Sequence, residues 1–373
     1  MSIKVVLVAG ARPNFMKIAP LWVEMNRFPS NFTPILLHTG QHYDYEMSRV
    51  FFEDLDLPEP DYFLGVGSGT HAEQTAGIMI EFEKVLQKER PDLVMVVGDV
   101  NSTLACSVTA KKLLIPIAHV EAGLRSFDMT MPEEINRKVT DTISDILFTP
   151  SMDANKNLVL EGVDGNKIHF VGNIMIDSLV KVLKRIDESY ENKIYNKFSV
   201  KRGNFVLVTL HRPSNVDDKN NLLKILNVLN DLSRNVPIIF PVHPRTKKNI
   251  NGLEKNSVFN EEFKIVEPLG YREFITLEKA PRFVLTDSGG IQEEATYLKI
   301  PCMTLRPNTE RPITITEGTN ELVSIETIKE KIESIVLGNW KQSKIPDLWD
   351  GKTAERIINI LKELEHLEIG QTT

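Results

Sequence analysis

Acidic and basic side chains gather in one short stretch of the chain, residues 116–137, which reads PIAHVEAGLRSFDMTMPEEINR. It holds Glu121, Glu133, Glu134, Arg125 and Arg137. Two carboxylates that lie close together raise the cost of charging each other, so one can stay ionised while the other holds a proton. Such a division of roles is what acid/base catalysis requires. The same residue types also form ordinary surface salt bridges, so the stretch by itself leaves both interpretations open.

Another carboxylate follows an apolar run in the same half of the chain. Asp99 comes directly after residues 92–97, within Gly98-Asp99-Val100-Asn101-Ser102. We expect Asn101 and Ser102 to cap the helix that follows, because short polar side chains satisfy free N–H groups there. Asp99 is then available as a ligand or a catalytic group.

Two cations follow the first apolar run, residues 3–9. Arg12 lies in the turn Gly10-Ala11-Arg12-Pro13, and Lys17 comes about one helical turn later. A helix start attracts anions because its first N–H groups are free, so both side chains can face a bound anion. Without such an anion they would be two solvated charges.

Polar residues also follow apolar runs of the second half. They are His211, His243, the run Ser288, Gly289 and Gly290, and Arg311. Ser288 opens a predicted helix. The free N–H groups of the first helical turn can bind a diphosphate, and the two glycines let it approach the main chain closely. Glu294, one turn later, is placed to accept hydrogen bonds from ribose hydroxyls. A glycine pair is also common as a plain turn, but a carboxylate in this register favours nucleotide binding.

Short apolar runs that alternate with segments of helical periodicity must position these residues. The runs are residues 3–9, 34–38, 92–97, 116–120, 145–149 and 168–171 in the first half, and 205–209, 236–242, 263–266, 282–286 and 300–305 in the second. Strands that alternate with helices predict a parallel sheet covered on both faces. The fold class is therefore α/β, with two Rossmann-like domains. We expect the active site in the cleft between them.

The polar run 187–203, rich in Lys, Asn and Glu, separates the two series of strands and is the best candidate for a domain boundary. The preceding helical stretch begins at residue 173. We therefore place the first domain at residues 1–172 and the second at residues 173–352. A charged amphipathic helix begins at Thr353.

Length and composition limit the possible functions. A chain of 373 residues is too long for one ordinary core, and 42% apolar with 25% charged residues is typical of a soluble globular protein. A formal charge of -7 argues against a broad nucleic-acid-binding face. Cys106 and Cys302, the only cysteines, lie in apolar segments, which indicates buried free thiols. The N-terminal stretch reads as a strand rather than a signal peptide, and no apolar run could cross a bilayer. We therefore expect a cytoplasmic protein without nucleic-acid or membrane partners.

The chain contains GARPNFMK at 10–17, GDVNST at 98–103, HVEAGLRSFDMTMPEEINR at 119–137, HR at 211, VHPRTKK from 242, DSGGIQEEA at 287–295 and ERP at 310. In this order the stretches resemble the non-hydrolysing UDP-N-acetylglucosamine 2-epimerases. The resemblance implies the two-domain architecture shared with GT-B glycosyltransferases, with the C-terminal helix 353–373 belonging to the first domain. It also implies a homodimer that interconverts UDP-GlcNAc and UDP-ManNAc for surface polysaccharide synthesis, without a nicotinamide or an essential metal.

Position by position, the resemblance implies a role for each candidate residue. The catalytic groups are Asp99, Glu121, Glu133 and the histidine near the diphosphate, His211. The substrate-binding groups are Arg12, Lys17, Arg137, His243 and Arg311 around the sugar and phosphates, Ser288, Gly289 and Gly290 in the diphosphate loop, Glu294 at the ribose and Phe274 near the uracil. Glu134, adjacent to Glu133 on the predicted helix, is expected to be structural.

Inversion at C2 of such a sugar is difficult because no adjacent carbonyl acidifies the C2–H bond. A workable route first breaks the C1–O bond and expels UDP, then removes the C2 proton to give 2-acetamidoglucal. The proton returns on the other face and UDP adds back. This route needs a site that keeps UDP bound and acid/base groups on both faces of the ring. Which carboxylate takes the proton in each direction stays open.

Several alternatives remain. An epimerase of UDP-2,3-diacetamido-2,3-dideoxyglucuronate fits the GARP and TGQHYD stretches nearly as well. A hydrolysing epimerase, a GT-B transferase and a catalytically silent nucleotide-sugar sensor are further possibilities, although a transferase or sensor has no need of Asp99 or of Glu121 with Glu133. No arginine for a second, activating UDP-GlcNAc site is evident at residues 69–74, so we predict activity without that activator.

A metal site is not expected. His38, His42 and Asp44 have ligand-like spacing, but Gly40 between the two histidines argues against one helical face.

Overall fold

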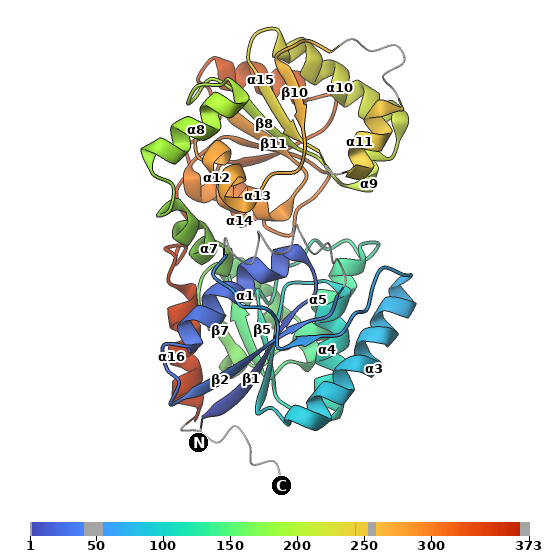
Figure 1. Cartoon of the computed structure of the whole chain (residues 1–373), viewed down its shortest axis with the longest axis vertical. Helices are drawn as coiled ribbons and strands as arrows, with labels where there is room; N and C mark the ends of the chain where they lie inside the picture. Colours follow the sequence, from blue (N-terminus) through green and yellow to red (C-terminus); the bar gives the residue numbers. More distant parts are fainter. Residues whose placement is uncertain (1, 41–54, 243, 253–258, 366–373) are drawn as a thin grey trace. The chain divides into compact units, whose positions relative to one another are not determined.

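The computed structural model describes residues 2–40, 55–242, 244–252 and 259–365. Contacts between residues divide the chain into two compact units. Unit 1 comprises Met1–Lys181 and Asp347–Thr373, and unit 2 comprises Val182–Pro346. Each unit is built on one parallel β-sheet with helices packed on it (Figure 1).

In the described part of unit 1 the sheet has seven parallel strands, in the order β3-β2-β1-β4-β5-β6-β7. The strands are β1 (Ile3–Ala9), β2 (Phe32–His38), β3 (Tyr62–Phe63), β4 (Leu93–Val97), β5 (Ile117–Val120), β6 (Ile146–Thr149) and β7 (Ile168–Phe170). The strand order reverses between β1 and β4, and α/β sheets bind ligands at the carboxyl ends of strands beside such a reversal. Every residue of β4 is buried, as expected for a strand with helices on both faces.

Helices connect most of the successive strands of unit 1, and two further helices follow its last strand in the chain. The helices are α1 (Arg12–Met25), α3 (His71–Glu89), α4 (Asn101–Lys112), α5 (Pro132–Ile143), α6 (Met152–Leu160), α7 (Ile174–Leu183) and α16 (Thr353–Glu365), with a short 3-10 helix at Gly165–Lys167. Helix α4 packs against both α3 and α5, and α16 packs against α1. The carboxyl ends of β1, β4 and β5 therefore lead directly into the segments that carry the candidate residues.

The sheet of unit 2 has six parallel strands within the described residues, in the order β10-β9-β8-β11-β12-β13. The strands are β8 (Val206–Thr209), β9 (Ile238–Pro241), β10 (Phe263–Val266), β11 (Phe283–Thr286), β12 (Cys302–Leu305) and β13 (Asn320–Val323). The helices are α8 (Glu188–Phe198), α9 (Pro213–Val216), α10 (Lys219–Ser233), α11 (Pro244–Asn251), α12 (Tyr271–Glu278), α13 (Gly289–Leu298), α14 (Ile313–Thr316) and α15 (Ile328–Val336). The central position of β8 and β11 places His211 and the Ser288 turn at adjacent strand ends.

The predicted α/β class with two Rossmann-like sheets is confirmed, and each predicted strand coincides with an observed strand to within two residues at either end. Two strands, β3 and β13, were not predicted. β3 has only two residues, and β13 includes Asn320 and Glu321, so neither forms an apolar run. Both lie at a sheet edge, where a single neighbouring strand suffices and polar residues are tolerated.

The units divide within α7 and again before residue 347, whereas the sequence placed the boundaries after residue 172 and before residue 353. The polar run 187–203, interpreted as a boundary segment, instead contains helix α8. This helix buries Ile194, Tyr195 and Phe198 in a core cluster of unit 2. Its exposed face is polar, which explains why the run resembles a linker in composition.

Both cysteines are buried free thiols, as predicted. Burial raises the pKa of Cys302 to about 12 and that of Cys106 well above its usual value, so both stay protonated and unreactive. No described helix combines the length and the apolar character needed to span a bilayer.

Helix α16 is attached to unit 1 by a buried carboxylate. Asp177 of α7 accepts hydrogen bonds from the N–H groups of Thr353 (3.1 Å) and Ala354 (2.8 Å), at the start of α16. The first N–H groups of a helix lack partners within the helix, so these contacts satisfy two of them. Ile358 and Leu361 on the same helix are fully buried.

The charge of Asp177 makes the stability of unit 1 depend on pH. Burial raises the pKa of Asp177 to about 6, against the opposing effect of the two N–H groups. Because the folded state then binds a proton more readily than the unfolded state, acidification favours folding until the pH falls below the unfolded pKa of about 4. We expect the unfolding free energy of the wild type to rise by up to about 3 kcal/mol relative to Asp177→Asn between about pH 7.5 and pH 4. Urea unfolding of both proteins across this range measures the difference, and parallel pH curves would contradict the prediction.

Candidate active site

Groups of both charges meet at the carboxyl ends of β1, β4 and β5. Lys17 of α1 and Glu121, the residue after β5, form an ion pair, and their side chains are only 8% and 4% exposed. Gly98, the residue after β4, lies beside them, because a Cβ built on it would be 2.8 Å from Lys17 Nζ and 3.5 Å from Glu121 Oε2. Its φ of 65° also favours glycine. The sheet thus brings together two predicted site residues that are 104 positions apart.

Glu121 has an unusual backbone conformation for a residue with a side chain. Its φ of 74° lies in the left-handed region, where such a residue costs about 1–3 kcal/mol. The N–H groups of Glu121 and Ala122 both donate to the carbonyl oxygen of Phe148, at 3.0 Å. Strain of this size persists only where the surrounding contacts impose it.

A buried network holds the backbone on both sides of Glu121. His119 Nε2 donates to the carbonyl oxygen of Gly98 (2.8 Å), and His119 Nδ1 lies 2.6 Å from Oδ1 of Asp141. Asp141 Oδ2 in turn accepts from the N–H of Gly123 (3.1 Å). The loops after β4 and β5 are thereby connected through one histidine and one carboxylate.

Arg125 extends this network. Its guanidinium donates to Asp141 (2.7 Å) and to both oxygens of Glu161 (3.0 and 2.6 Å), and its side chain is fully buried. Burial opposes ionisation of Asp141, but contacts with His119 and Arg125 outweigh burial and lower its pKa. The sequence grouped Arg125 with the acid/base candidates, whereas the structure places it in this supporting network.

Arg137 connects two carboxylates. Its Nη1 donates to Asp99, and its Nη2 donates to Oε2 of Glu134 at 2.6 Å. The side chains of Arg137 and Glu134 are 2% and 1% exposed, whereas Asp99 is 26% exposed. Asp99 therefore presents part of its carboxylate to solvent while a buried cation holds the other part. We call Lys17, Asp99, Glu121 and Arg137 the unit 1 cluster, and no described contact joins Glu133 to it.

Glu134 has the structural environment expected from the sequence. Its carboxylate accepts from the N–H groups of Ser126 (2.9 Å) and Phe127 (3.1 Å) and from the Ser126 hydroxyl (2.9 Å). Burial opposes its ionisation, but these bonds together with Arg137 outweigh burial and lower its pKa. Its neighbour Glu133 is half-buried on α5 and has no hydrogen-bond or ion-pair partner among the described residues.

The predicted caps of α4 were wrong. The N-cap is Val100, without a side-chain hydrogen bond. Asn101 instead donates to Gln74 Oε1 (2.7 Å), and the Ser102 hydroxyl bonds with that of Thr39 (2.8 Å). Partners on α3 and after β2, far away in the sequence, take both side chains away from the helix terminus.

In unit 2, His211 and Asp287 form a pair at the ends of the adjacent strands β8 and β11. His211 Nδ1 lies 2.9 Å from Asp287 Oδ1, and the His211 N–H donates to the same carboxylate at 3.1 Å. The Asp287 side chain is fully buried, whereas that of His211 is 56% exposed. A carboxylate at Nδ1 fixes the orientation of the ring and leaves Nε2 for a ligand.

Asp287 was not among the residues for which a role was predicted from the sequence. Its carboxylate also accepts from the Arg212 N–H and the Asn215 amide, each at 2.9 Å. Burial opposes its ionisation, but His211 and these donors outweigh burial and lower its pKa. In the sequence, Asp287 follows one predicted strand and His211 follows another, which could have marked Asp287 as a site residue. Only the pairing of β8 with β11 shows that the two residues are neighbours.

The start of α13 presents free N–H groups beside the guanidinium of Arg311. Ser288 is the N-cap and makes no side-chain cap bond, and Gly289 and Gly290 are the first helical residues. A Cβ built on Gly289 would be 2.6 Å from Arg311 Nη1 and 2.9 Å from Glu310 Oε1, so the guanidinium lies against the first turn. Free helical N–H groups attract an anion, and the Arg311 guanidinium beside them is ion-paired with Glu293 and Glu310.

Glu294 on α13 is only 3% exposed. The Tyr271 hydroxyl donates to its Oε1 at 2.7 Å. Burial raises the pKa of Glu294 to about 7. A second buried carboxyl group, Glu278, contacts it and was not expected from the sequence.

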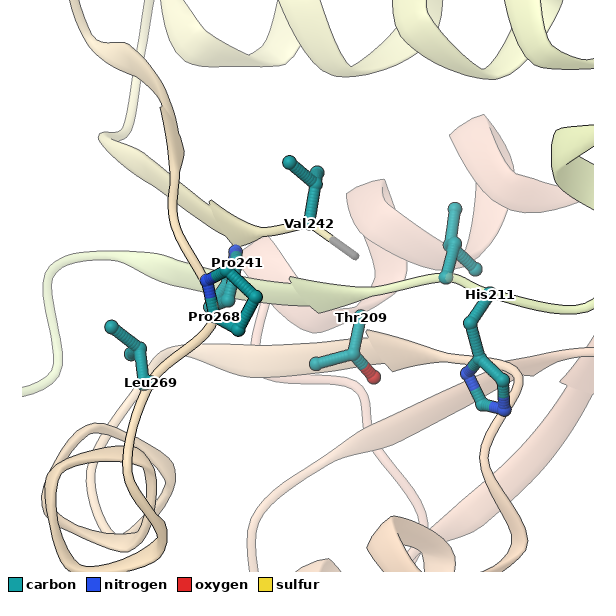
Figure 2. A pocket seen from close by; sticks show the side chains of 7 residues that line it. Thr209, His211, Pro241, Val242, Pro268 and Leu269 are labelled. Carbon is teal, nitrogen blue, oxygen red and sulfur yellow. The ribbon is translucent and has the colours of Figure 1, made fainter. Parts of the chain in front are cut away.

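A hollow of about 160 Å³ lies at the carboxyl ends of β8 and β9 (Figure 2). It is lined by Thr209, Leu210, His211, Pro241, Val242, Pro268 and Leu269. Pockets that enclose a drug-sized ligand are roughly 300–1,000 Å³, so this hollow accommodates one part of a larger molecule. Phe274, predicted to lie near a uracil, packs on the same core cluster as Leu269.

Some predicted residues lie outside the described part of the structure. These are His243, the metal-ligand candidates His42 and Asp44, and the side chain of Arg12, whose backbone begins α1. Within the described residues, no group of three His, Cys, Asp or Glu side chains is placed to hold a metal ion.

Known proteins are similar to this chain over most of its length. A protein of Methanococcus maripaludis described as a UDP-N-acetylglucosamine 2-epimerase homolog is 46% identical, over 97% of this chain and all of that protein. The UDP-2,3-diacetamido-2,3-dideoxy-D-glucuronate 2-epimerase of Pseudomonas aeruginosa is 42% identical, over 86% of this chain and 88% of that protein.

Among solved structures, that of the Methanocaldococcus jannaschii UDP-GlcNAc 2-epimerase in complex with UDP-GlcNAc and UDP is similar, with a TM-score of 0.85. Its sequence is 44% identical, and the match covers 97% of this chain and all of that one. The family model described as UDP-N-acetylglucosamine 2-epimerase matches residues 24–362. This chain therefore belongs to the UDP-N-acetylglucosamine 2-epimerase family.

Proposed function

We propose that this protein reversibly inverts C2 of UDP-N-acetylglucosamine to give UDP-N-acetylmannosamine. The observation that carries the proposal is the unit 1 cluster. There, Asp99 and Glu121 each follow a central strand and each contact a buried cation. A nucleotide-sugar sensor or a glycosyltransferase needs a nucleotide site, but it has no use for such a set of acid/base groups.

The reaction proceeds by elimination and addition. The C1–O bond breaks and UDP leaves with the electron pair, so positive charge develops at C1 and acidifies the C2–H bond. A carboxylate then removes the C2 proton, and the product is 2-acetamidoglucal. A second acid returns a proton to the opposite face of C2, and the diphosphate oxygen adds back to C1. Each positioned acid or base contributes about 10²- to 10⁴-fold.

Each group has a proposed part in these steps. Asp99, Glu121 and Glu133 carry protons to and from the sugar. His211, held through Nδ1 by Asp287, leaves Nε2 to stabilise the departing diphosphate. Lys17, held by Glu121, adds positive charge to the same step.

Unit 2 supplies the nucleotide site in this proposal. The first N–H groups of α13 and the Arg311 guanidinium beside Gly289 bind the diphosphate. The hollow beside His211 is of a size for one part of the nucleotide, and its lining of proline, leucine and valine side chains suits the uracil base. Glu294 accepts hydrogen bonds from the ribose.

Incubation with UDP-GlcNAc in D₂O tests the proposal. We expect deuterium to enter C2 together with a manno signal in the NMR spectrum, because the C2 proton is exchanged during inversion. Binding of UDP-GlcNAc without exchange would support a sensor and contradict the proposal. Release of free ManNAc without UDP-ManNAc would establish a hydrolysing enzyme instead.

A second candidate substrate is UDP-2,3-diacetamido-2,3-dideoxyglucuronate, because an epimerase of that sugar is 42% identical to this chain. The two substrates differ in charge at C6 and in the group at C3. Parallel D₂O reactions with both sugars discriminate between them through kcat/KM. A larger value for the diacetamido uronate would replace the first proposal.

We also propose that the protein is a homodimer in the cytoplasm. Large apolar side chains are exposed on α3, just after α4 and on α5. Helix α4 packs against both α3 and α5, so these side chains lie on neighbouring elements. Contact with a second copy of the chain would bury them. They are Ile80, Leu114, Ile135 and Val139. Analytical ultracentrifugation measures the oligomeric state, and a monomer at micromolar concentration would contradict the proposed dimer.

The proposed location in the cytoplasm is supported by the two buried free thiols, which fit a reducing compartment.

A further inference from the structure

Two carboxyl groups are buried against each other in unit 2. Glu278 ends α12 and is completely buried, and Glu294 lies in the second turn of α13 with 3% exposure. The two side chains contact each other. Neither oxygen of Glu278 accepts a hydrogen bond from an N–H or O–H group of the described residues.

Two ionised carboxylates cannot share a buried contact, because each only accepts hydrogen bonds and their charges repel. A proton on one of them removes both difficulties. Burial and the charge of Glu294 raise the pKa of Glu278 well above its usual value, whereas that of Glu294 is raised only to about 7. Glu278 is therefore the protonated partner, and its O–H donates to Glu294.

The groups around the pair agree with this assignment. Tyr271 on α12 donates its hydroxyl to Glu294 Oε1 at 2.7 Å. Glu293, next along α13, opposes ionisation of Glu294, and its own carboxylate contacts Arg311 at 2.9 Å. On β12, Cys302 lies near Glu278 and is itself protonated. No cation among these groups contacts Glu278. The proton of Glu278 therefore neutralises its charge and donates the hydrogen bond to Glu294 that a cation would otherwise provide.

We propose that Glu278 is a positioning residue, whose proton holds Glu294 as a hydrogen-bond acceptor for the ribose hydroxyls of a uridine nucleotide. The inference rests on the proposed function, in which Glu294 contacts the ribose. With O–H donors from Tyr271 and Glu278, Glu294 is ionised above about pH 7 and is fixed in one orientation. Without Glu278, the buried Glu294 takes up a proton itself and is a poorer acceptor for the ribose.

The proposal can be tested with two variants and two ligands, by calorimetric titration at pH 7.5. Glu278→Gln keeps an N–H donor to Glu294, whereas Glu278→Leu has a similar volume and no donor. The ligands are UDP and 2′,3′-dideoxy-UDP, which lacks the hydroxyls that Glu294 is proposed to bind. We expect Glu278→Leu to bind UDP at least about tenfold more weakly than the wild type and Glu278→Gln to stay within about threefold. Neither variant should change the affinity for dideoxy-UDP.

The pH dependence gives an independent readout. In the wild type, the ratio of the affinities for UDP and dideoxy-UDP should rise as the pH passes upward through about 7, because Glu294 then ionises. In Glu278→Leu the rise should move to higher pH. Taking the ratio removes the ionisation of the phosphate, which both ligands share.

Three outcomes would overturn the inference. The first is binding of UDP by Glu278→Leu as tight as that of the wild type. The second is an equal loss of affinity for both ligands in Glu278→Leu, as expected of a purely structural residue. The third is a wild-type protein that binds UDP and dideoxy-UDP with the same affinity. In each of these cases UDP binding by the wild type leaves the proposed function intact. A wild-type protein that binds neither ligand would instead refute the nucleotide site of the proposed function and this inference with it.

Discussion

Replacing Glu121 by glutamine is expected to abolish net epimerisation, with kcat lower by about 10²- to 10⁴-fold and UDP affinity within about threefold of the wild type. The amide has the size of the carboxylate and still accepts a hydrogen bond from Lys17, but it cannot take up a proton at neutral pH. UDP affinity should be kept because the proposed nucleotide site lies in unit 2.

Solvent exchange shows which face of the sugar Glu121 serves. If one carboxylate acts on each face, removing one stops inversion in both directions but leaves exchange at C2 for the epimer that the other carboxylate deprotonates. In D₂O, Glu121→Gln should therefore exchange deuterium into only one of UDP-GlcNAc and UDP-ManNAc. Asp99→Asn should show the opposite preference if these two residues form the pair.

Asp145→Asn is the matched control for Glu121→Gln. Asp145 precedes β6, at the amino end of the same sheet, where its carboxylate bonds to Lys111 and to the Ile117 N–H. The substitution makes the same change in charge away from the unit 1 cluster, so kcat should change by less than about threefold. Epimerisation by Glu121→Gln at the wild-type rate, or an equal loss in Asp145→Asn, would contradict the role of Glu121.

Replacing Arg137 by methionine should cost about 3–5 kcal/mol of unfolding free energy in unit 1 and also abolish activity. Arg137 and Glu134 are 2% and 1% exposed, so the substitution leaves Glu134 as a buried charge without its cation. It also removes the guanidinium that contacts Asp99. Because the chain has two units, hydrogen exchange followed during urea unfolding is the suitable measurement, since it reports each unit separately.

A double variant separates the two effects of this substitution. Arg137→Met with Glu134→Gln no longer has a buried unpaired charge, and the glutamine oxygen can still accept from Ser126. We expect it to regain about half of the lost stability but no activity, because Asp99 still lacks its cation. Arg202→Met, at an ion pair whose arginine is 62% exposed, should cost less than about 1 kcal/mol. A stable, active Arg137→Met would show that neither carboxylate depends on the guanidinium.

Much of the fold could be predicted from the sequence because parallel strands buried on both faces are continuous apolar runs. The run of β4 is buried at every residue, and β1 and β10 begin and end where predicted. Asp99, Glu121, His211 and Ser288 lie one or two residues after observed strands, as the positions of the apolar runs predicted. The strands without such a run, β3 and β13, could not be found in this way, because their contacts at a sheet edge demand no apolar pattern.

The partners of the candidate residues could not be predicted in the same way. Asn101 and Ser102 have the residue types of caps, and only α3 and the segment after β2 give them other hydrogen bonds. Asp287 and His211 are 76 positions apart and become neighbours because β8 pairs with β11. Glu278 carries no sequence signal at all, since its importance comes from its complete burial against Glu294.

The sequence by itself determined that the chain forms two series of buried parallel strands and that carboxylates, histidines and glycines follow these strands. Apolar periodicity and turn residues depend only on residues that are close in the sequence, so they can be recognised from the sequence without a structure. The tertiary structure alone decided which carboxylate is paired with Lys17, which with Arg137, and which is buried against another carboxyl group. Charge and proton affinity depend on burial and on partners from distant segments, and these exist only once strand order has brought the segments together.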